Sequence, residues 1–284
     1  MIIDCHVHML SDKGYDEKLI KEVRRLGIDR ICLLAMHPEV PGWGSFMASN
    51  EIVIRTYEKY PEIVIPFGFF DLGLDPPGLV DELHTAGFKG IKFTRARLNY
   101  DDKSLYPVYE RMERCGMAAL FHTGTVLRTP IDKKQDVNSN RLRPIYLDPI
   151  ARAFPKLNII GAHLGNPWYD EAAMTIFWNP NVHFDLSGTI LKRKKADWFK
   201  ETLWWFPEVM EKLAPDKETT IYRSAGSAPH PFDRIVFGTD VPIPEMEQAK
   251  LEYERILKEL AVPDSVSRRV WGETVASFIR GPGK

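Results

Sequence analysis

The amino-acid sequence predicts a single (β/α)8 barrel that spans residues 1–284. Short apolar runs rich in β-branched residues recur eight times, and helical patterns lie between most of them. No linker rich in proline, glycine or serine divides the chain. Repeated alternation of strand and helix favours a closed parallel barrel. The lack of a GxGxxG loop after the first run argues against an open doubly wound sheet.

The eight predicted strands set the order of the barrel. They cover residues 2–7, 30–35, 63–69, 89–94, 118–123, 158–163, 182–186 and 234–239. Residues 19–26 and 79–86 have apolar side chains at helical spacing and run into a glycine that can end a helix. A further helix is expected to open at Asp148, and residues 246–260 carry a long apolar stripe. The long polar loop over residues 128–143 is expected on the active-site face.

The composition is that of a globular protein and limits the classes of function. A formal net charge of −1 and a pI near 6.7 give no electrostatic reason to expect nucleic acid as a partner. The three cysteines are far apart and form no CxxC pair, which argues against disulfides and favours a reducing cytoplasm. No apolar run approaches the ~20 residues of a membrane helix. We expect a cytoplasmic protein with a small-molecule substrate, in which the aromatic residues 198–206 form a core helix or the interface of a homodimer.

Histidines and one aspartate close four of the predicted strands. His6 and His8 end the first strand, and side chains two residues apart on a strand point to the same face, so one metal ion can accept both imidazoles. His122, His163 and Asp240 end the fifth, sixth and eighth strands. Because the carboxyl ends of barrel strands meet at one mouth, we expect these five side chains to converge.

This set of residue types is what a catalytic metal ion requires. Imidazole and carboxylate ligands that leave one position open are typical of catalytic zinc. A pair of histidines on one strand is as often merely packed or hydrogen-bonded, but five such residues at strand ends predict a metal site. Gly161 and Gly238 lie two residues before His163 and Asp240, and we expect both glycines to face inward and leave room for the ligands.

As a set, these motifs resemble the amidohydrolase superfamily, in the branch that includes aminocarboxymuconate-semialdehyde decarboxylase. The Asp-x-His-x-His motif, the histidines that close strands five and six, and the final Gly-Thr-Asp carry the resemblance, which covers nearly the whole chain. It implies a distorted TIM barrel with a divalent metal ion, most often Zn²⁺, at its mouth. By position it implies His6, His8, His122 and Asp240 as metal ligands. It also implies catalytic roles for His163, as the acid/base residue, and for Asp240.

Other residues near the mouth have two interpretations each. Lys92 is expected to point inward. It either pairs with a carboxylate or an anionic substrate or, carboxylated as in binuclear members of the superfamily, bridges a second metal ion and makes His163 a ligand. Arg95 either grips a substrate carboxylate or is solvated surface charge. Trp168 either walls the pocket or packs in the core, and Asp4 either orients a ligand histidine or satisfies backbone donors.

Two reactions fit such a site. A metal ion held by imidazoles and a carboxylate lowers the pKa of a bound water to about 7. The first hypothesis is a metal-dependent hydrolase that acts on a small carboxylated or cyclic substrate, such as an amide or a lactone. The second is a zinc-dependent, non-oxidative decarboxylase of an aromatic or muconate-like acid, in which a histidine delivers a proton to the carbon that loses CO2. A metal-binding protein without catalysis gains little support, because storage needs no histidine outside the ligand set.

Overall fold

The computed structural model of the protein describes residues 1–188, 193–213 and 228–279. Its main sheet contains eight strands in the order β1-β2-β5-β6-β7-β8-β9-β10, and neighbouring strands along this order run parallel. The strands are β1 (Ile3–His8), β2 (Arg30–Leu34), β5 (Val64–Phe69), β6 (Gly90–Phe93), β7 (Ala118–Phe121), β8 (Ile159–Gly161), β9 (Val182–Asp185) and β10 (Ile235–Val236). All eight predicted strands are therefore confirmed in order.

Backbone hydrogen bonds close this sheet into a barrel. The N–H of Cys5 donates to the Phe237 carbonyl at 2.9 Å, and the N–H of Asp240 donates to the His6 carbonyl at 2.8 Å. These bonds join the first strand to the chain that continues from the last one. The predicted (β/α)8 barrel is confirmed, in a form distorted by short strands such as β10.

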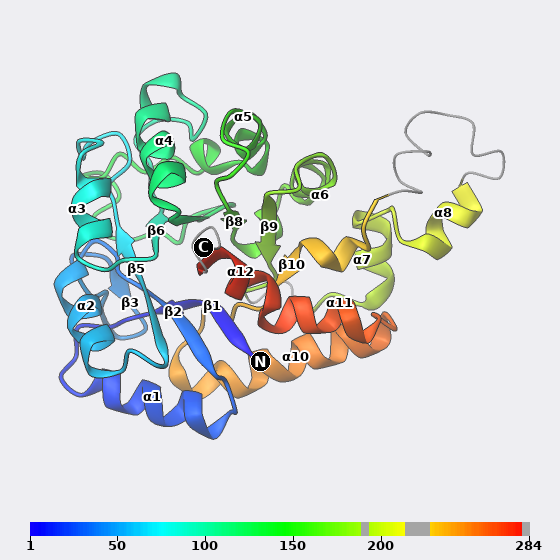
Figure 1. Cartoon of the computed structure of the whole chain (residues 1–284), viewed down its shortest axis with the longest axis horizontal. Coiled ribbons are helices and arrows are strands. Elements are labelled where there is room, and N and C mark those ends of the chain that lie inside the picture. Colours follow the sequence, from blue (N-terminus) through cyan, green and yellow to red (C-terminus); the bar gives the residue numbers. More distant parts are fainter. Residues whose placement is uncertain (189–192, 214–227, 280–284) are drawn as a thin grey trace.

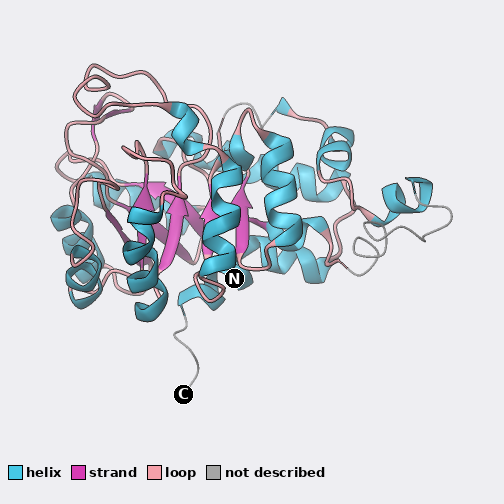
Figure 2. Ribbon diagram, turned by 90° about the horizontal axis from the view of Figure 1, so that it is seen from above, coloured by secondary structure: helices cyan, strands magenta, loops and turns pink. Residues whose placement is uncertain are grey.

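Helices surround the barrel (Figure 1), and Figure 2 shows the strands running between them. They are α1 (Tyr15–Arg25), α2 (Asn50–Lys59), α3 (Leu79–Thr85), α4 (Tyr106–Cys115), α5 (Leu147–Ala153), α6 (Tyr169–Trp178), α7 (Ala196–Thr202), α8 (Pro207–Leu213), α10 (Met246–Glu259), α11 (Asp264–Arg268) and α12 (Thr274–Ile279). The predicted helices correspond to α1, α3, α5 and α10. Gly27 and Gly87 follow α1 and α3 with φ of 65° and 104°, a left-handed backbone that glycine adopts without strain. Among the described residues, no helix is long and apolar enough to cross a membrane.

Apolar side chains form two layers, one inside the barrel and one beneath the helices. The inner layer is Ile3, Cys5, Cys32, Leu34, Ile65, Phe67, Ala118, Leu120, Ile160, Ala162 and Val236, with Val275, Ala276 and Phe278 of α12. Helix α12 thus covers the amino-terminal end of the barrel (Figure 1). On β6, Ile91 and Phe93 belong to the outer layer. Lys92, between them, therefore points inward as predicted.

The aromatic residues 198–206 pack within the protein, as a core helix would. Phe199, on α7, and Phe206 are buried, and the ring of Trp198 meets that of Tyr169 with centroids 4.8 Å apart. This packing accounts for the aromatic residues through contacts inside one chain. The homodimer stays a prediction.

A hairpin beside the barrel mouth was not predicted from the sequence. A short antiparallel hairpin, β3 (Pro41–Gly42) and β4 (Ser45–Phe46), follows β2 at the carboxyl end of the barrel. Each strand is only two residues long, too short to show a period in the sequence. The hairpin matters because it walls the cavity described below.

Candidate metal centre

The strand ends bring all five predicted side chains together. One ligand atom from each of His6, His8 and Asp240 lies within 4.8 Å of the others. Oδ1 of Asp240 is 3.7 Å from Nε2 of His6 and 3.4 Å from Nε2 of His8. Oδ2 of Asp240 is 3.6 Å from Nε2 of His163, which in turn is 3.3 Å from Nδ1 of His122. The predicted convergence is therefore present, with Asp240 at its centre.

A β-bulge in β1 aims the first two histidines inward. Asp4 pairs with Ile31 on β2 and Val7 pairs with Leu33, so three steps along β1 match two steps along β2. Cys5 points into the barrel, and without the bulge the next residue, His6, would point out under the helices. The extra residue shifts the alternation, so that His6 and His8 face inward while Val7 joins the outer layer.

At the end of β8, a left-handed turn directs His163 towards the site. Ile160 and Ala162 take the inward positions on this strand. The expected inward placement of Gly161 is wrong: a Cβ there would collide with the ring of Phe184 in the outer layer. His163 reaches the site because its backbone turns, with φ of 62°. The expectation for Gly238 is correct, since a Cβ there would press on Cys5 and His6 inside the barrel.

Asp185, at the end of β9, is a site residue that the sequence analysis missed. It is fully buried, and its Oδ2 lies 2.8 Å from Nδ1 of His6. Burial raises the pKa of Asp185, but the charge and hydrogen bond of His6 outweigh burial and hold the pKa well below its usual range. A carboxylate only accepts hydrogen bonds, so Nδ1 of His6 carries the proton and the lone pair of Nε2 faces the site, where Nζ of Lys92 lies 3.0 Å away.

The second oxygen of Asp185 orients His163. Oδ1 accepts hydrogen bonds from the N–H of His163 at 2.9 Å and from the hydroxyl of Ser187 at 2.5 Å. The Ser187 hydroxyl thereby donates its only proton to the hydrogen bond with Asp185. Its oxygen accepts from Nδ1 of His163, 2.8 Å away. A neutral His163 protonated on Nδ1 has its lone pair on Nε2, which faces Asp240 and His122.

His122 directs a lone pair towards Nε2 of His163. Its Nε2 lies 3.3 Å from the Thr125 carbonyl oxygen, which can only accept, so Nε2 carries the proton and Nδ1 does not. Burial lowers the pKa of both His122 and His163, which keeps both rings neutral at neutral pH. Two unprotonated nitrogens 3.3 Å apart repel each other unless a proton or a cation lies with them. These two unprotonated nitrogens would therefore suit a metal ion.

His8 adds an unsatisfied atom to the set. Its Nδ1 is buried and has no hydrogen-bond partner among residues 1–188, 193–213 and 228–279. Burial lowers the pKa of His8 and, reinforced by the Lys92 charge, lowers the pKa of His6 to about 3. The ring nitrogens of both residues are therefore available as neutral ligands.

Asp4 and Lys92 lie close to the donors. Asp4 satisfies backbone donors, which was one of its two interpretations: Oδ1 accepts from the N–H groups of His6 and Thr239, both at 3.0 Å, and Oδ2 accepts from the Thr239 hydroxyl at 2.6 Å. Asp4 thus ties β1 to the segment that carries Asp240. Lys92 is 1% exposed and its Nζ lies 3.0 Å from Nε2 of His6. Burial lowers the pKa of Lys92 to about 8.

A cavity of about 610 Å³ opens directly above these residues. His8, Lys92, His122 and Asp240 form its inner end. Its outer walls are the β3–β4 hairpin and residues 126–129, the start of the long loop that was expected on this face. Three large apolar side chains that are exposed to solvent, Trp43, Phe46 and Leu127, lie at its rim.

The remaining predicted site residues take other positions. Arg95 lines the cavity but its guanidinium is already bound: Nη1 lies 2.8 Å from Oδ1 of Asp132, and Nη2 donates to the Leu127 carbonyl at 3.2 Å. Arg95 therefore fastens the long loop to the barrel. Trp168 is not among the residues that line this cavity, and the guanidinium of Arg143 lies over its ring at 5.6 Å from the centroid.

Buried imidazoles and a carboxylate around one point, at the carboxyl end of a parallel barrel, define the class of metal-dependent barrel enzymes. The family comparison agrees with this class, since the model of the amidohydrolase family matches residues 3–276. The chain belongs to the amidohydrolase family. No curated protein matches it.

Solved structures share the fold at low identity. An uncharacterised TIM-barrel protein from Bordetella bronchiseptica is 16% identical, with a TM-score of 0.67 over 98% of this chain and 97% of that chain. A 5-carboxyvanillate decarboxylase from Sphingomonas paucimobilis is 16% identical, with a TM-score of 0.60 over 98% of both chains. A dihydroxybenzoic acid decarboxylase from Polaromonas, solved with bound manganese and the inhibitor 2-nitroresorcinol, is 14% identical, with a TM-score of 0.62 over 98% of this chain and 96% of that chain. At these identities the likeness shows the fold.

Proposed function

We propose that the protein is a metal-dependent hydrolase that acts on a small carboxylated or cyclic substrate, an amide or a lactone. The observation that carries this proposal is the group of ligand atoms of His6, His8 and Asp240, which lie within 4.8 Å of one another beside a cavity that His8, His122 and Asp240 line. His163 lies beside that point with its own lone pair on Nε2. The family membership supports a metal-dependent enzyme.

The residues present fit one divalent ion. Nε2 of His6, Nε2 of His8, Nδ1 of His122 and a carboxylate oxygen of Asp240 would hold it. A donor set dominated by imidazole suits Zn²⁺, and manganese, which the Polaromonas decarboxylase binds, is the competing choice. When bound, such an ion lowers the pKa of a coordinated water and polarises a substrate oxygen. A second ion would require Lys92 to be carboxylated.

His163 would carry the proton during the reaction. Its Nδ1 is held by Ser187, so only Nε2 is free to exchange a proton with the substrate. In hydrolysis, Nε2 accepts a proton from the attacking water and returns it to the leaving nitrogen or oxygen. Asp240 stabilises the protonated ring, because its Oδ2 lies 3.6 Å from Nε2.

The cavity also indicates the class of substrate. The cationic Lys92 at its inner end would hold a carboxylate, and the apolar rim of Trp43, Phe46 and Leu127 would cover a flat apolar body. Arg95 would act on the substrate through the loop that it holds rather than by direct contact, because Asp132 already occupies its guanidinium. Substrate contact by Trp168 would require a substrate that extends beyond this cavity.

A non-oxidative decarboxylase of an aromatic or muconate-like acid is the second candidate. The same apolar rim and buried lysine suit an aromatic acid, and two of the structural neighbours described above are decarboxylases of aromatic acids. In this reaction Nε2 of His163 would first take up a proton from solvent and then deliver it to the carbon that loses CO2. The two candidate reactions use the same residues but incorporate different atoms of the solvent into the product.

Isotopes from the solvent separate the two reactions. The metal-loaded protein would be incubated with a panel of small lactones, amides and aromatic acids in ¹⁸O-labelled water and, separately, in D₂O. Hydrolysis places ¹⁸O in the product and releases no CO2. Decarboxylation places deuterium on the carbon that loses CO2. Turnover of carboxylated substrates with CO2 release and no ¹⁸O in the organic product would overturn the hydrolase proposal.

A further inference from the structure

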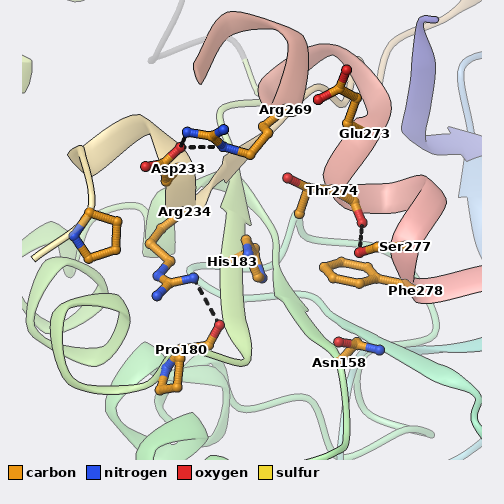
Figure 3. Close-up of a pocket in the computed structure, with 11 residues that line it drawn as sticks. Asn158, Pro180, His183, Asp233, Arg234, Arg269, Glu273, Thr274, Ser277 and Phe278 are labelled. Carbon is orange, nitrogen blue, oxygen red and sulfur yellow. Dashed lines mark hydrogen bonds and ion pairs between the residues drawn. The ribbon is translucent and has the colours of Figure 1, made fainter. Parts of the chain in front are cut away.

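A second cavity, of about 540 Å³, lies at the opposite end of the barrel from the metal centre (Figure 3). It is formed where β8, β9 and β10 begin and where α12 covers the barrel. Asn158 precedes β8, His183 is the second residue of β9, and Arg234 precedes β10. In Figure 3, His183 lies between Arg234 on one side and Phe278 of α12 on the other.

His183 is a buried polar side chain without a partner. It is 5% exposed, and its Nδ1 accepts or donates no hydrogen bond among the described parts of the chain. Its ring packs against Phe278 with centroids 5.1 Å apart. Buried polar atoms in native proteins are nearly always bonded, so this nitrogen, in a residue that lines the cavity, is an exception that calls for an explanation.

Arg234 adds a cation that forms no ion pair with the described residues. In the described residues its guanidinium makes one hydrogen bond, from Nη1 to the Pro180 carbonyl at 3.0 Å, and no ion pair (Figure 3). The two carboxylates that line the cavity are already engaged. Asp233 is held by Nε of Arg269 at 2.6 Å, and Glu273 lies 3.4 Å from Nε of Arg268. The charge left over in the cavity is therefore positive.

At this cation, burial outweighs the charge of the nearby Asp233. Desolvation lowers the pKa of Arg234, and burial together with the Arg234 charge lowers the pKa of His183 to about 3. A partly buried guanidinium is stabilised most strongly by a carboxylate, which accepts two of its parallel N–H groups. The neutral His183 offers one further donor or acceptor to the same ligand.

We infer that this cavity is a second binding site, which takes a small organic carboxylate with a flat apolar body. The carboxylate pairs with Arg234, the amide of Asn158 and the His183 ring bond its polar edge, and Phe278 and Pro180 pack against the flat body. The site is separate from the metal centre and requires no metal ion. The inference can therefore be tested independently of the proposed hydrolysis.

Benzoate and its neutral isostere benzamide test this inference by titration calorimetry on the metal-loaded full chain. We expect benzoate to bind with an affinity that falls at least about tenfold in Arg234→Gln, because a charged hydrogen-bond donor is lost. Asn158→Asp keeps the shape of the side chain and adds a negative charge, so it should weaken benzoate but not benzamide. Arg24→Gln, on the exposed surface of α1, is the matched control and should bind as the wild type does.

His8→Ala distinguishes the two ends of the barrel. Benzoate that binds at the lower cavity persists in this variant, whereas benzoate that binds only beside the metal ion is lost. Absence of benzoate binding in the wild type, equal affinity in Arg234→Gln and Asn158→Asp, or loss in His8→Ala alone would each overturn the inference. Thermal melting of every variant identifies any that is unfolded, and if Arg234→Gln is one of them, Asn158→Asp decides.

Discussion

The two ends of this barrel differ in how their buried polar groups are hydrogen-bonded. At the carboxyl end, Asp185, Ser187 and the Thr125 carbonyl each bind one nitrogen of a histidine, so that the other nitrogen carries the lone pair. At the amino end, His183 and Arg234 face a cavity with almost no partners. The first arrangement fixes tautomers so that lone pairs meet at one point, as a metal ion requires. The second leaves a cation uncompensated, as an anion site requires.

The largest effect should follow the loss of a ligand at the carboxyl end. His8→Ala removes a donor that contacts Asp240 and little else, so metal and activity should disappear together. The loss of activity should exceed the ~10²–10⁴-fold that a missing proton carrier costs. Elemental analysis of the purified variant measures the metal directly. A full metal complement in His8→Ala would contradict the ligand assignment.

Loss of the proton carrier should leave the metal in place. His163→Ala is expected to keep the metal content of the wild type and to lower kcat by roughly 10²–10⁴-fold, because Nε2 no longer transfers the proton. Elemental analysis and steady-state kinetics on one preparation check both halves. Loss of metal from this variant would make His163 a ligand and would favour a binuclear site bridged by a carboxylated Lys92.

The orienting role of Asp185 predicts a smaller effect. Asp185→Asn keeps the shape of the side chain but cannot accept from His6, the His163 N–H and Ser187 together. Metal affinity or kcat should fall about 10–100-fold, with KM little changed. Asp81→Asn is the matched control, because Asp81 pairs with Arg111 and Arg114 on the surface. Equal metal affinity and kcat in the two variants would show that Asp185 has no orienting role in the site.

The smallest effect concerns stability at the amino end. His183 is neutral in the native protein, where its pKa is lowered from 6.5 to about 3, whereas the unfolded chain takes up a proton below about pH 6.5. Its contribution to stability is therefore complete above pH 6.5 and is lost as the pH falls towards 3. Between pH 6.5 and 5 the loss amounts to about 2 kcal/mol.

Urea unfolding at pH 7 and pH 5, without added carboxylates, measures this contribution. His183→Gln has no titrating ring, so its free energy of unfolding should fall less between the two pH values than that of the wild type. All other titrating groups are shared, and the difference between the proteins isolates His183. Parallel pH dependence in the two proteins would show that His183 does not titrate with a lowered pKa.

The sequence predicted the fold and the converging side chains because both depend on periodic features. Eight apolar runs and their order determine the barrel, and a residue at the carboxyl end of a barrel strand lies at its mouth wherever it falls in the chain. His122 and Asp240 were found in this way. The inward direction of Lys92 followed from the alternation of side chains along β6.

Local departures from the strand periodicity could not be predicted from the sequence. The bulge in β1 and the left-handed backbone at His163 change which way a side chain points, and the alternation along a strand does not predict either. The two-residue strands of the β3–β4 hairpin carry no period at all. Asp185 was missed although it ends the seventh predicted strand. The strand-end rule that found Asp240 could have found it.

Crystallography with anomalous scattering at the zinc edge, on protein saturated with zinc, tests the central claim most directly. We predict one peak, about 2.0–2.2 Å from Nε2 of His6 and His8 and from an oxygen of Asp240, with His122 at the fourth position. The amine of Lys92 should be unmodified. Zinc absent from this point, with the imidazoles turned away from one another, would contradict the account.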